Sequence, residues 1–346
     1  MIHAMIMAGG KGTRFWPLSR KDCPKQFLSI VDGKSLIEST IDRLKPLTKP
    51  ATRWIIANAT NANYLKRIKS VPAKNILLEP VGRNTAPCIG WGALEALKAD
   101  KNAIMLVMPA DHFISNEKAF VKTIESAYKF LQENNKLLTI GVSPTSPHTG
   151  YGYIEVESEN AISPIKQFRE KPNLPTAMDY LERGTFYWNS GIFMWRADKI
   201  IELLDKYMAT DMAILRKIMG LKSHSTKTLL PLYKQLTNDS IDYAILEKCP
   251  EEIVCMKANF PWSDIGSWTA LREFWPKDTH ENSTNGKKAI LLNSHRNMIY
   301  SQKRTVTLID TDDYLVIDTD DALLIAPQSS DQRIKELVQL LPDHLE

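Results

Sequence analysis

The chain has 346 residues, of which 43% are hydrophobic, and this length is enough for a large core and for more than one domain. Its 44 Lys and Arg residues stand against 40 Asp and Glu residues, so the net charge is only +4. This balance is too mild to indicate nucleic acid or a membrane as a partner, and any basic function must be local.

The cysteines and the N-terminus both indicate a cytoplasmic protein. Four cysteines form no C-x-x-C pair and have no histidines at zinc-ligand spacing, so we expect reduced thiols: Cys23, Cys88, Cys249 and Cys255. The N-terminal apolar stretch is about seven residues long, and no apolar run approaches the 18 residues or so that a membrane span requires.

Short apolar segments alternate with amphipathic ones over residues 1–145. Residues 2–8 predict a buried strand, and Ser35 with Glu38 forms a capping box that predicts a helix from Ser35. The pattern continues with predicted strands over 53–58, 75–78, 103–108 and 137–142, and predicted helices over 60–70, 86–99 and 117–133. This alternation is typical of an α/β fold, in which helices cover both faces of a mostly parallel sheet.

The second half of the chain continues without a linker and then changes character. Shorter strands at 151–156, 165–170 and 190–195 alternate with helices near 176–183, 197–206 and 211–219. We therefore expect one domain over 1–276, with halves over 1–145 and 146–276, and a boundary in the polar segment 277–288. Beyond it, apolar clusters at 290–292, 298–300, 306–309, 314–317 and 322–325 predict successive short strands, and a helix over 332–341 closes a second, small domain over 285–346.

A glycine-rich stretch with clustered cations follows the first predicted strand. Residues 5–27, MIMAGGKGTRFWPLSRKDCPKQF, match neither the P-loop nor the G-x-G-x-x-G spacing, since the last glycine of the latter would fall on Phe15. Glycines after a strand still let backbone N–H groups approach an anion closely. Four cations of the stretch could neutralise that anion: Lys11, Arg14, Arg20 and Lys25. A tight turn on a solvated basic surface is the alternative.

Two aspartates are candidate metal ligands. Asp111, in MPADHF, follows the predicted strand 103–108, and ligands bind at the carboxyl ends of the strands in open α/β sheets. Asp264 lies in PWSDIGSW, far along the chain. Magnesium prefers one or two carboxylates together with phosphate oxygens and water, so the two could share one ion. Taken alone, each aspartate could equally serve a turn.

The motifs together resemble a known family. G-G-K-G-T-R-F-W-P-L-S-R resembles the signature of the sugar-1-phosphate nucleotidyltransferases, and the following P-K-Q-F-L resembles their mannose-1-phosphate guanylyltransferase (GDP-mannose pyrophosphorylase) branch. G-R-N-T-A-P at 82–87 and P-A-D-H at 109–112 agree with that branch. The resemblance covers residues 1 to about 340. It implies the short, single-function form, with a Rossmann-like nucleotidyltransferase domain and a small C-terminal left-handed β-helix-like domain.

The resemblance also implies roles for single residues. The glycine loop would wrap a triphosphate, the loop 82–87 would contact the base and ribose, and Asp111 with Asp264 would bind Mg²⁺. The implied nucleotide-binding residues are Gly9, Gly10, Gly12, Thr13, Arg14, Lys25, Asn84, Thr85 and Asp111. The implied sugar-phosphate-binding residues are Gly152, Glu170, Lys171 and Asn189. Without the resemblance, Asn84 or Thr85 would be a helix cap, and residues 168–172 a solvated edge strand.

The implied reaction is the transfer of GMP from GTP to mannose 1-phosphate, which gives GDP-mannose and pyrophosphate with the help of Mg²⁺. The implied catalytic residues are Arg14, Lys25, Asp111, Lys171 and Asp264. Three alternatives remain: a nucleotidyltransferase for another sugar or base, a regulatory relative that binds nucleotide sugar without turnover, and a nicotinamide-dependent dehydrogenase. A homodimer is the assembly to test, since the sequence does not fix the oligomeric state.

Overall fold

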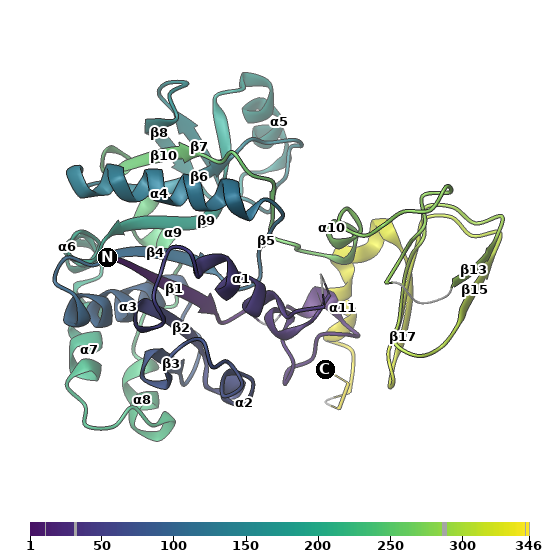
Figure 1. Cartoon of the computed structure of the whole chain (residues 1–346), viewed down its shortest axis with the longest axis horizontal. Helices are drawn as coiled ribbons and strands as arrows, with labels where there is room; N and C mark the ends of the chain where they lie inside the picture. Colours follow the sequence, from purple (N-terminus) through teal and green to yellow (C-terminus); the bar gives the residue numbers. More distant parts are fainter. Residues whose placement is uncertain (11, 31–32, 286–288, 343, 346) are drawn as a thin grey trace. The chain divides into compact units, whose positions relative to one another are not determined.

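The computed structural model describes residues 1–10, 12–30, 33–285, 289–342 and 344–345. By its internal contacts the chain divides into two compact units (Figure 1). The sheet unit consists of Met1–Gly9, Thr40–Ala110 and Ile114–Trp262, and the loop unit of Gly10–Ser39, Asp111–Phe113 and Ser263–Glu346. This division by contact does not test the predicted domain boundary between residues 276 and 285, which stays a prediction.

The sheet unit is built on one sheet of nine strands in the order β3-β2-β1-β4-β9-β6-β10-β8-β7. The strands are β1 (Ile2–Ala8), β2 (Arg53–Asn58), β3 (Ile76–Glu79), β4 (Ile104–Pro109), β6 (Leu137–Val142), β7 (Tyr153–Val156), β8 (Ile162–Arg169), β9 (Phe186–Arg196) and β10 (Ile253–Lys257). The strands β3, β2, β1 and β4 are parallel, while β9 inserts antiparallel between β4 and β6. Because β9 comes from the second half of the predicted domain, both halves share one sheet.

All eight predicted helices are present, two of them shorter than predicted, and three further helices were not predicted. The helices are α1 (Leu36–Leu44), α2 (Ala62–Leu65), α3 (Thr85–Ala99), α4 (Glu117–Glu133), α5 (Leu174–Arg183), α6 (Ala197–Tyr207), α7 (Ala209–Met219), α8 (Thr226–Tyr233), α9 (Ile241–Ala244), α10 (Trp268–Arg272) and α11 (Ile334–Val338). The three that were not predicted are α8, α9 and α10. The two-residue strands β5 (Phe113–Ile114) and β11 (Trp262–Ser263) lie where the chain passes from one unit to the other.

The helix predicted over 60–70 is wrong in extent, because α2 ends at Leu65. The next N–H groups, of Arg67 and Ile68, bond to carbonyls three residues back, so the chain tightens into 3₁₀ turns before Pro72. The helix predicted over 332–341 is also shorter: α11 follows a 3₁₀ helix at Gln328–Arg333 and ends in turns of the same kind.

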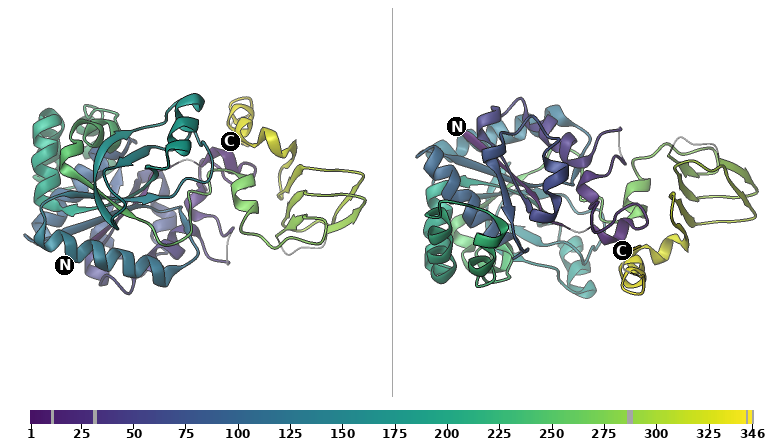
Figure 2. Two further views of the ribbon diagram at one scale, coloured as in Figure 1. Left: turned by 90° about the horizontal axis from the view of Figure 1, so that it is seen from above. Right: turned by 90° about the horizontal axis from the view of Figure 1, so that it is seen from below.

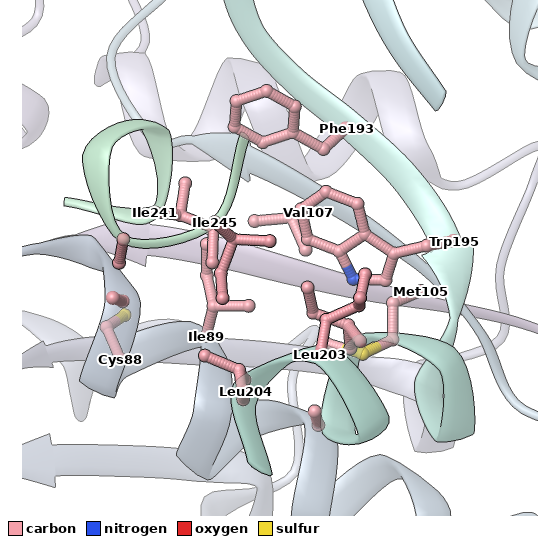
Figure 3. Close-up of a cluster of buried hydrophobic side chains, with 14 of the residues drawn as sticks. Cys88, Ile89, Met105, Val107, Phe193, Trp195, Leu203, Leu204, Ile241 and Ile245 are labelled. Carbon is pink, nitrogen blue, oxygen red and sulfur yellow. The ribbon is translucent and has the colours of Figure 1, made fainter. Parts of the chain in front are cut away.

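The largest hydrophobic cluster of the sheet unit joins the central strands to α3, α6 and α9. Figure 3 shows Ile89 of α3 beside Ile245, the residue that follows α9, with Trp195 of β9 packed near Leu203 of α6. Trp195 is fully buried. This packing fixes the N-terminus of α3, and with it the loop 82–87, on the sheet.

A second cluster joins the separate stretches of the loop unit. Trp268 is fully buried, its ring centre lies 5.1 Å from that of Phe15, and its Nε1 donates to the carbonyl of Trp16 at 3.2 Å. The indole N–H of Trp16 donates in turn to the carbonyl of Leu345 at 2.8 Å. Each buried indole N–H thus donates to a carbonyl of the other stretch: Trp268 to the glycine stretch, and Trp16 to the C-terminal segment. These hydrogen bonds fix the glycine loop on the C-terminal segment.

The C-terminal part of the loop unit coils into a β-helix-like stack. Strands β12 (Ser283–Thr284), β14 (Met298–Ser301), β16 (Tyr314–Asp318) and β17 (Leu323–Pro327) form one sheet, and β13 (Ala289–Leu292) and β15 (Val306–Ile309) form another. Figure 2 shows the coils as flattened loops stacked on one another. The β13–β15 and β14–β16 pairings are parallel.

Hydrogen bonds between side chains recur at a fixed spacing along the stack, from one coil to the next. Asn293 donates to Asp310 and Arg296 to Asp313, each across 17 residues, and all four have positive φ. One coil therefore takes 17 residues and carries two strands, which explains the apolar spacing of eight or nine residues in the sequence.

No helix in the described part of the chain combines the length and the apolar character needed to cross a bilayer.

Candidate active site

The glycine loop folds back on the segment that carries Lys25. Gly12 has φ of +63°, and a Cβ at this position would lie 2.3 Å from Cβ of Lys25 and 2.9 Å from its backbone nitrogen. The hydroxyl of Ser19 donates to the carbonyl of Gly12 at 2.8 Å. Only glycine fits here, because any side chain would push the loop away from Lys25.

Lys25 joins the two aspartates that the sequence proposes as metal ligands. Its Nζ donates to Oδ2 of Asp111 at 2.9 Å and to the main-chain oxygen of Asp264 at 2.6 Å. Lys25 is only 5% exposed, and a buried ammonium is tolerated because it has such partners. Three distant segments of the loop unit thus meet at one cation.

Asp111 is held in its ionised form. Burial by itself would raise the pKa of its carboxyl, but the positive charges of Lys25 and His112 and the hydrogen bond from Lys25 outweigh it. The pKa of Asp111 therefore lies below its ordinary value. An ionised carboxylate is the form that ligates a hard cation.

A cavity of about 290 Å³ in the loop unit gathers these groups. It is lined by Gly12, Thr13, Arg14, Phe15, Lys25, Asp111, His112, Asp264, Gly266 and Lys335. The guanidinium of Arg14 donates to the carbonyl of Gly266 at 3.3 Å. The structure therefore brings together both predicted phosphate-binding cations and both predicted metal-binding aspartates.

Other residues of the glycine stretch lie elsewhere. Gly9 belongs to the sheet unit, and a Cβ on Gly9 would lie 3.7 Å from Oε2 of Glu79. A Cβ on Gly10 would have no neighbouring atom within 4 Å. Neither glycine lines the cavity. Arg20 forms an ion pair with Asp321 at 2.9 Å, so its charge is engaged there. Lys11 lies outside the described residues.

The donor set of the cavity suits a hard divalent cation. The carboxylate of Asp264 lies close to Gly266, since a Cβ on Gly266 would lie 2.9 Å from Oδ2 of Asp264. Nowhere in residues 1–10, 12–30, 33–285, 289–342 and 344–345 do three or more His, Cys, Asp or Glu side chains form a metal cluster. Two carboxylates in a cavity with cations fit an ion that completes its coordination with phosphate oxygens and water.

In the sheet unit, the four residues predicted to bind sugar phosphate form a second cluster. A Cβ on Gly152 would lie 2.3 Å from Oε2 of Glu170 and 3.3 Å from Cβ of Asn189, so glycine leaves the space that the carboxylate occupies. The backbone N–H of Asn189 donates to the carbonyl of Gly152 at 2.8 Å. The start of β7, the end of β8 and the interior of β9 therefore bring these four residues together.

Lys171 forms an ion pair with the neighbouring Glu170. Lys171 has φ of +45°, a strained backbone conformation that lets the side chains of Glu170 and Lys171 meet. Burial acts to lower the pKa of Lys171, but the hydrogen bond to Glu170 and the charges of Glu170 and Asp242 outweigh it, so its pKa is raised. The ammonium is positively charged at neutral pH.

Sequence reasoning missed two carboxylates of this cluster. Oδ1 of Asp242 accepts from the amide of Asn189 at 2.9 Å, and Oε1 of Glu247 accepts from the backbone N–H of Glu170 at 2.8 Å. Burial, followed by the charge of Glu170, raises the pKa of Asp242 to about 6. No local pattern signals these contacts, because the partners lie far away along the chain.

The loop 82–87 adjoins the same cluster through α9. Asn84 caps α3, and its side-chain oxygen accepts from the N–H of Thr85 at 2.9 Å. The hydroxyl of Thr85 accepts from the N–H of Ile241 at 2.9 Å, next to Asp242. The cap that the sequence left open between Asn84 and Thr85 is thus made by Asn84, while Thr85 binds α9.

Two family models match most of this chain. The family model "Nucleotidyl transferase" matches residues 3–281. This chain belongs to the nucleotidyl transferase family. A second family model, "MannoseP isomerase/GMP-like beta-helix domain", matches residues 287–341 of this nucleotidyl transferase.

Two individual relatives of this nucleotidyl transferase match over nearly its whole length, and a third matches over about three quarters of it. A mannose-1-phosphate guanylyltransferase of Salmonella montevideo is 40% identical, over 98% of this chain and 74% of that protein. The crystal structure of a mannose-1-phosphate geranyltransferase from Thermus thermophilus superposes with a TM-score of 0.89 at 31% identity, over 98% of each chain. A mannose-6-phosphate isomerase from Helicobacter pylori superposes with a TM-score of 0.61 at 28% identity, over 76% of this chain and 99% of that one.

Proposed function

We propose that this protein transfers GMP from GTP to mannose 1-phosphate, giving GDP-mannose and pyrophosphate. The observation that carries the proposal is the cavity of the loop unit, in which Arg14, Lys25, Asp111 and Asp264 converge. The choice of substrates is supported by the guanylyltransferase of Salmonella montevideo, which is similar over nearly the whole chain.

The loop unit would bind the phosphates of the nucleotide. Gly12 and Thr13 line the cavity, where their backbone N–H groups would approach a bound anion closely, and Arg14 adds a fixed positive charge. Lys25 would hold Asp111 in place and offer its remaining N–H to a phosphate oxygen. Positive charge fixed in advance stabilises the charge that develops on pyrophosphate as it leaves.

Asp111 and Asp264 would hold Mg²⁺, since both are carboxylates that line one cavity and Asp111 is kept ionised. When bound, the ion supplies positive charge to the phosphate oxygens. Lys25 would keep both metal-binding segments together, because it bonds to the side chain of one and the main chain of the other.

The cluster of the sheet unit would bind mannose 1-phosphate. The Lys171 ammonium suits the sugar phosphate, while Glu170 and Asn189 offer acceptors and donors for hydroxyls. The sugar phosphate is already an anion at neutral pH, so it can attack the α-phosphorus in line with little proton transfer. The main task of the protein is to orient two anions against each other. We assign contact with the base and ribose to Asn84 and Thr85.

The test is a matrix of four nucleoside triphosphates against several sugar 1-phosphates, with pyrophosphate release measured in Mg²⁺ and in excess chelator. We expect the highest kcat/KM for GTP with mannose 1-phosphate, and loss of release in chelator. A different preferred pair would indicate a nucleotidyltransferase for another sugar or base. No release with any pair would support a regulatory relative. Mannose 6-phosphate forms a separate arm, in which isomerisation would indicate an isomerase.

We also propose a cytoplasmic homodimer as the working state. The cytoplasmic location is supported by the four cysteines, all of which are free thiols. Size-exclusion chromatography with light scattering tests the assembly, and a mass near 39.3 kDa would show a monomer instead.

A further inference from the structure

Lys335 places a cation in the cavity of the loop unit from the C-terminal helix. It lies in α11, and it lines the same cavity as Gly12, Arg14 and Asp111. Figure 1 shows α11 beside the purple 3₁₀ turn at Thr13–Phe15, and the two elements are in contact. A phosphate bound by this turn would therefore be close to α11.

The other cations of the cavity already have protein partners. The Lys25 ammonium is buried and bonds to Asp111 and Asp264, and the Arg14 guanidinium bonds to the carbonyl of Gly266. Lys335 is exposed, and in the described part of the chain its ammonium has no hydrogen-bond or ion-pair partner. Lys335 is thus the cation whose donors are all available to a ligand.

The charges of the cavity also favour a role for Lys335. Apart from Lys335 and His112, the cavity is lined by two cations, Arg14 and Lys25, and by two carboxylates, Asp111 and Asp264, whose formal charges cancel. A triphosphate carries about three to four negative charges, so additional positive charge near the loop strengthens its binding. Lys335 supplies this charge without neutralising a carboxylate that a metal ion would use.

We propose that Lys335 binds the terminal phosphates of the nucleotide, and hence the pyrophosphate that leaves. This inference rests on the proposed function. It makes the C-terminal segment a direct part of the substrate site, in addition to the packing of α11 against the glycine loop. Lys335 contacts phosphates that do not become part of the nucleotide-sugar product, and this gives it a distinct kinetic signature.

The test compares Lys335→Gln with Lys335→Arg in the full chain. We expect Lys335→Gln to raise the KM for GTP about tenfold, which corresponds to the loss of one charge-assisted contact, and to leave the KM for mannose 1-phosphate unchanged. In the reverse direction, the KM for pyrophosphate rises and that for GDP-mannose does not. Lys335→Arg restores most of the affinity because it keeps the charge.

Lys303→Gln is the matched control. Lys303 is an exposed lysine of the same unit that pairs with Asp320 and does not line the cavity. If Lys335→Gln leaves the KM values for GTP and pyrophosphate unchanged, the proposal is wrong. It is also wrong if Lys303→Gln raises them equally, because the effect would then be one of overall charge.

A binding measurement separates this proposal from the proposed function. Magnesium pyrophosphate is titrated by calorimetry into the wild type, Lys335→Gln and Lys303→Gln, a readout that needs no turnover. If Lys335→Gln weakens this binding while the wild type makes no GDP-mannose, the site assignment holds and the proposed function fails. If all three proteins bind equally while the wild type is active, only the assignment of Lys335 fails.

Discussion

The ammonium of Lys25 lies 2.9 Å from Oδ2 of Asp111, and the same ammonium bonds to the main chain of Asp264 at 2.6 Å. One buried cation therefore fixes both carboxylate segments and lowers the pKa of Asp111. An interaction of this kind is costly to break, because removal of one partner leaves the other charge buried and unpaired.

Asp111→Asn is expected to reduce kcat by about 10²-fold or more, since it removes a metal-binding charge and the partner of Lys25. Initial rates at saturating GTP and mannose 1-phosphate measure the loss. Asp320→Asn, on an exposed carboxylate of the same unit, is the control and keeps its rate. Turnover of Asp111→Asn close to that of the wild type would contradict the assignment of Asp111 as a metal-binding residue.

Gly12→Ala is expected to lower both Tm and activity. The new Cβ would meet Cβ of Lys25 at 2.3 Å, and φ of +63° is unfavourable for alanine, so the loop must move. Backbone strain of this kind costs about 1–2 kcal/mol. Gly10→Ala is the stability control, because no atom lies within 4 Å of its new Cβ. Equal Tm values for the two variants would contradict this account of the loop.

Asp242→Ala is expected to raise the KM for mannose 1-phosphate about fivefold, because Asn189 loses the acceptor that orients its amide. Asp242 acts through Asn189 and is a positioning residue, so the KM for GTP should not change. Steady-state kinetics with each substrate varied in turn makes the comparison. Asp198→Ala, at an exposed carboxylate paired with Arg196, is the control. A fall in kcat with both KM values unchanged would be inconsistent with positioning.

Glu79 predicts a pH dependence of stability. Burial raises its pKa to about 7 from an ordinary value of 4.5, although a hydrogen bond from Tyr233 lowers it in part. The folded state therefore keeps the proton between pH 4.5 and 7, whereas the unfolded chain loses it. The free energy of unfolding falls as the pH rises through this window, by about 3 kcal/mol in total, and is level above it.

Urea unfolding at about pH 5, 6, 7 and 8 tests this dependence. Glu79 is faced by two other titratable groups, the phenol of Tyr233 and the thiol of Cys88. Burial raises the pKa of each well above its ordinary value, so both stay neutral throughout this pH series. The Glu79→Gln variant has no proton to lose at this position, so its free energy of unfolding should not show the fall that Glu79 causes between pH 4.5 and 7. Parallel curves for the wild type and Glu79→Gln would show that Glu79 does not titrate in this window.

The sequence predicted those features that depend on residues close together in the chain. The helix α4 was predicted at its observed bounds, because an amphipathic repeat with Asn116 as cap determines a long helix locally. The capping box also formed, with the N–H of Ser35 donating to Glu38 at 3.1 Å. The predictions for 60–70 and 332–341 were too long, since weak local preferences gave way to 3₁₀ turns near Pro72 and Pro342.

The strands after residue 285 illustrate the limit of local pattern. Apolar clusters predicted their positions, but the coil of 17 residues became visible only from the pairing of Met298 with Leu315 and of Ala289 with Val306. Register between strands depends on contacts between coils, and apolar spacing alone does not define which strands pair.

By itself, the sequence determined most of the helices and strands in their order, the glycine loop, and the residue types that phosphate and metal chemistry require. The tertiary structure alone decided that Lys25 is engaged by both aspartate segments, that Asp242 orients Asn189, and that Lys335 lines the phosphate cavity. The physical reason is that a side chain's partner is set by packing between segments far apart in the chain. Such contacts leave no spacing or periodicity in the sequence.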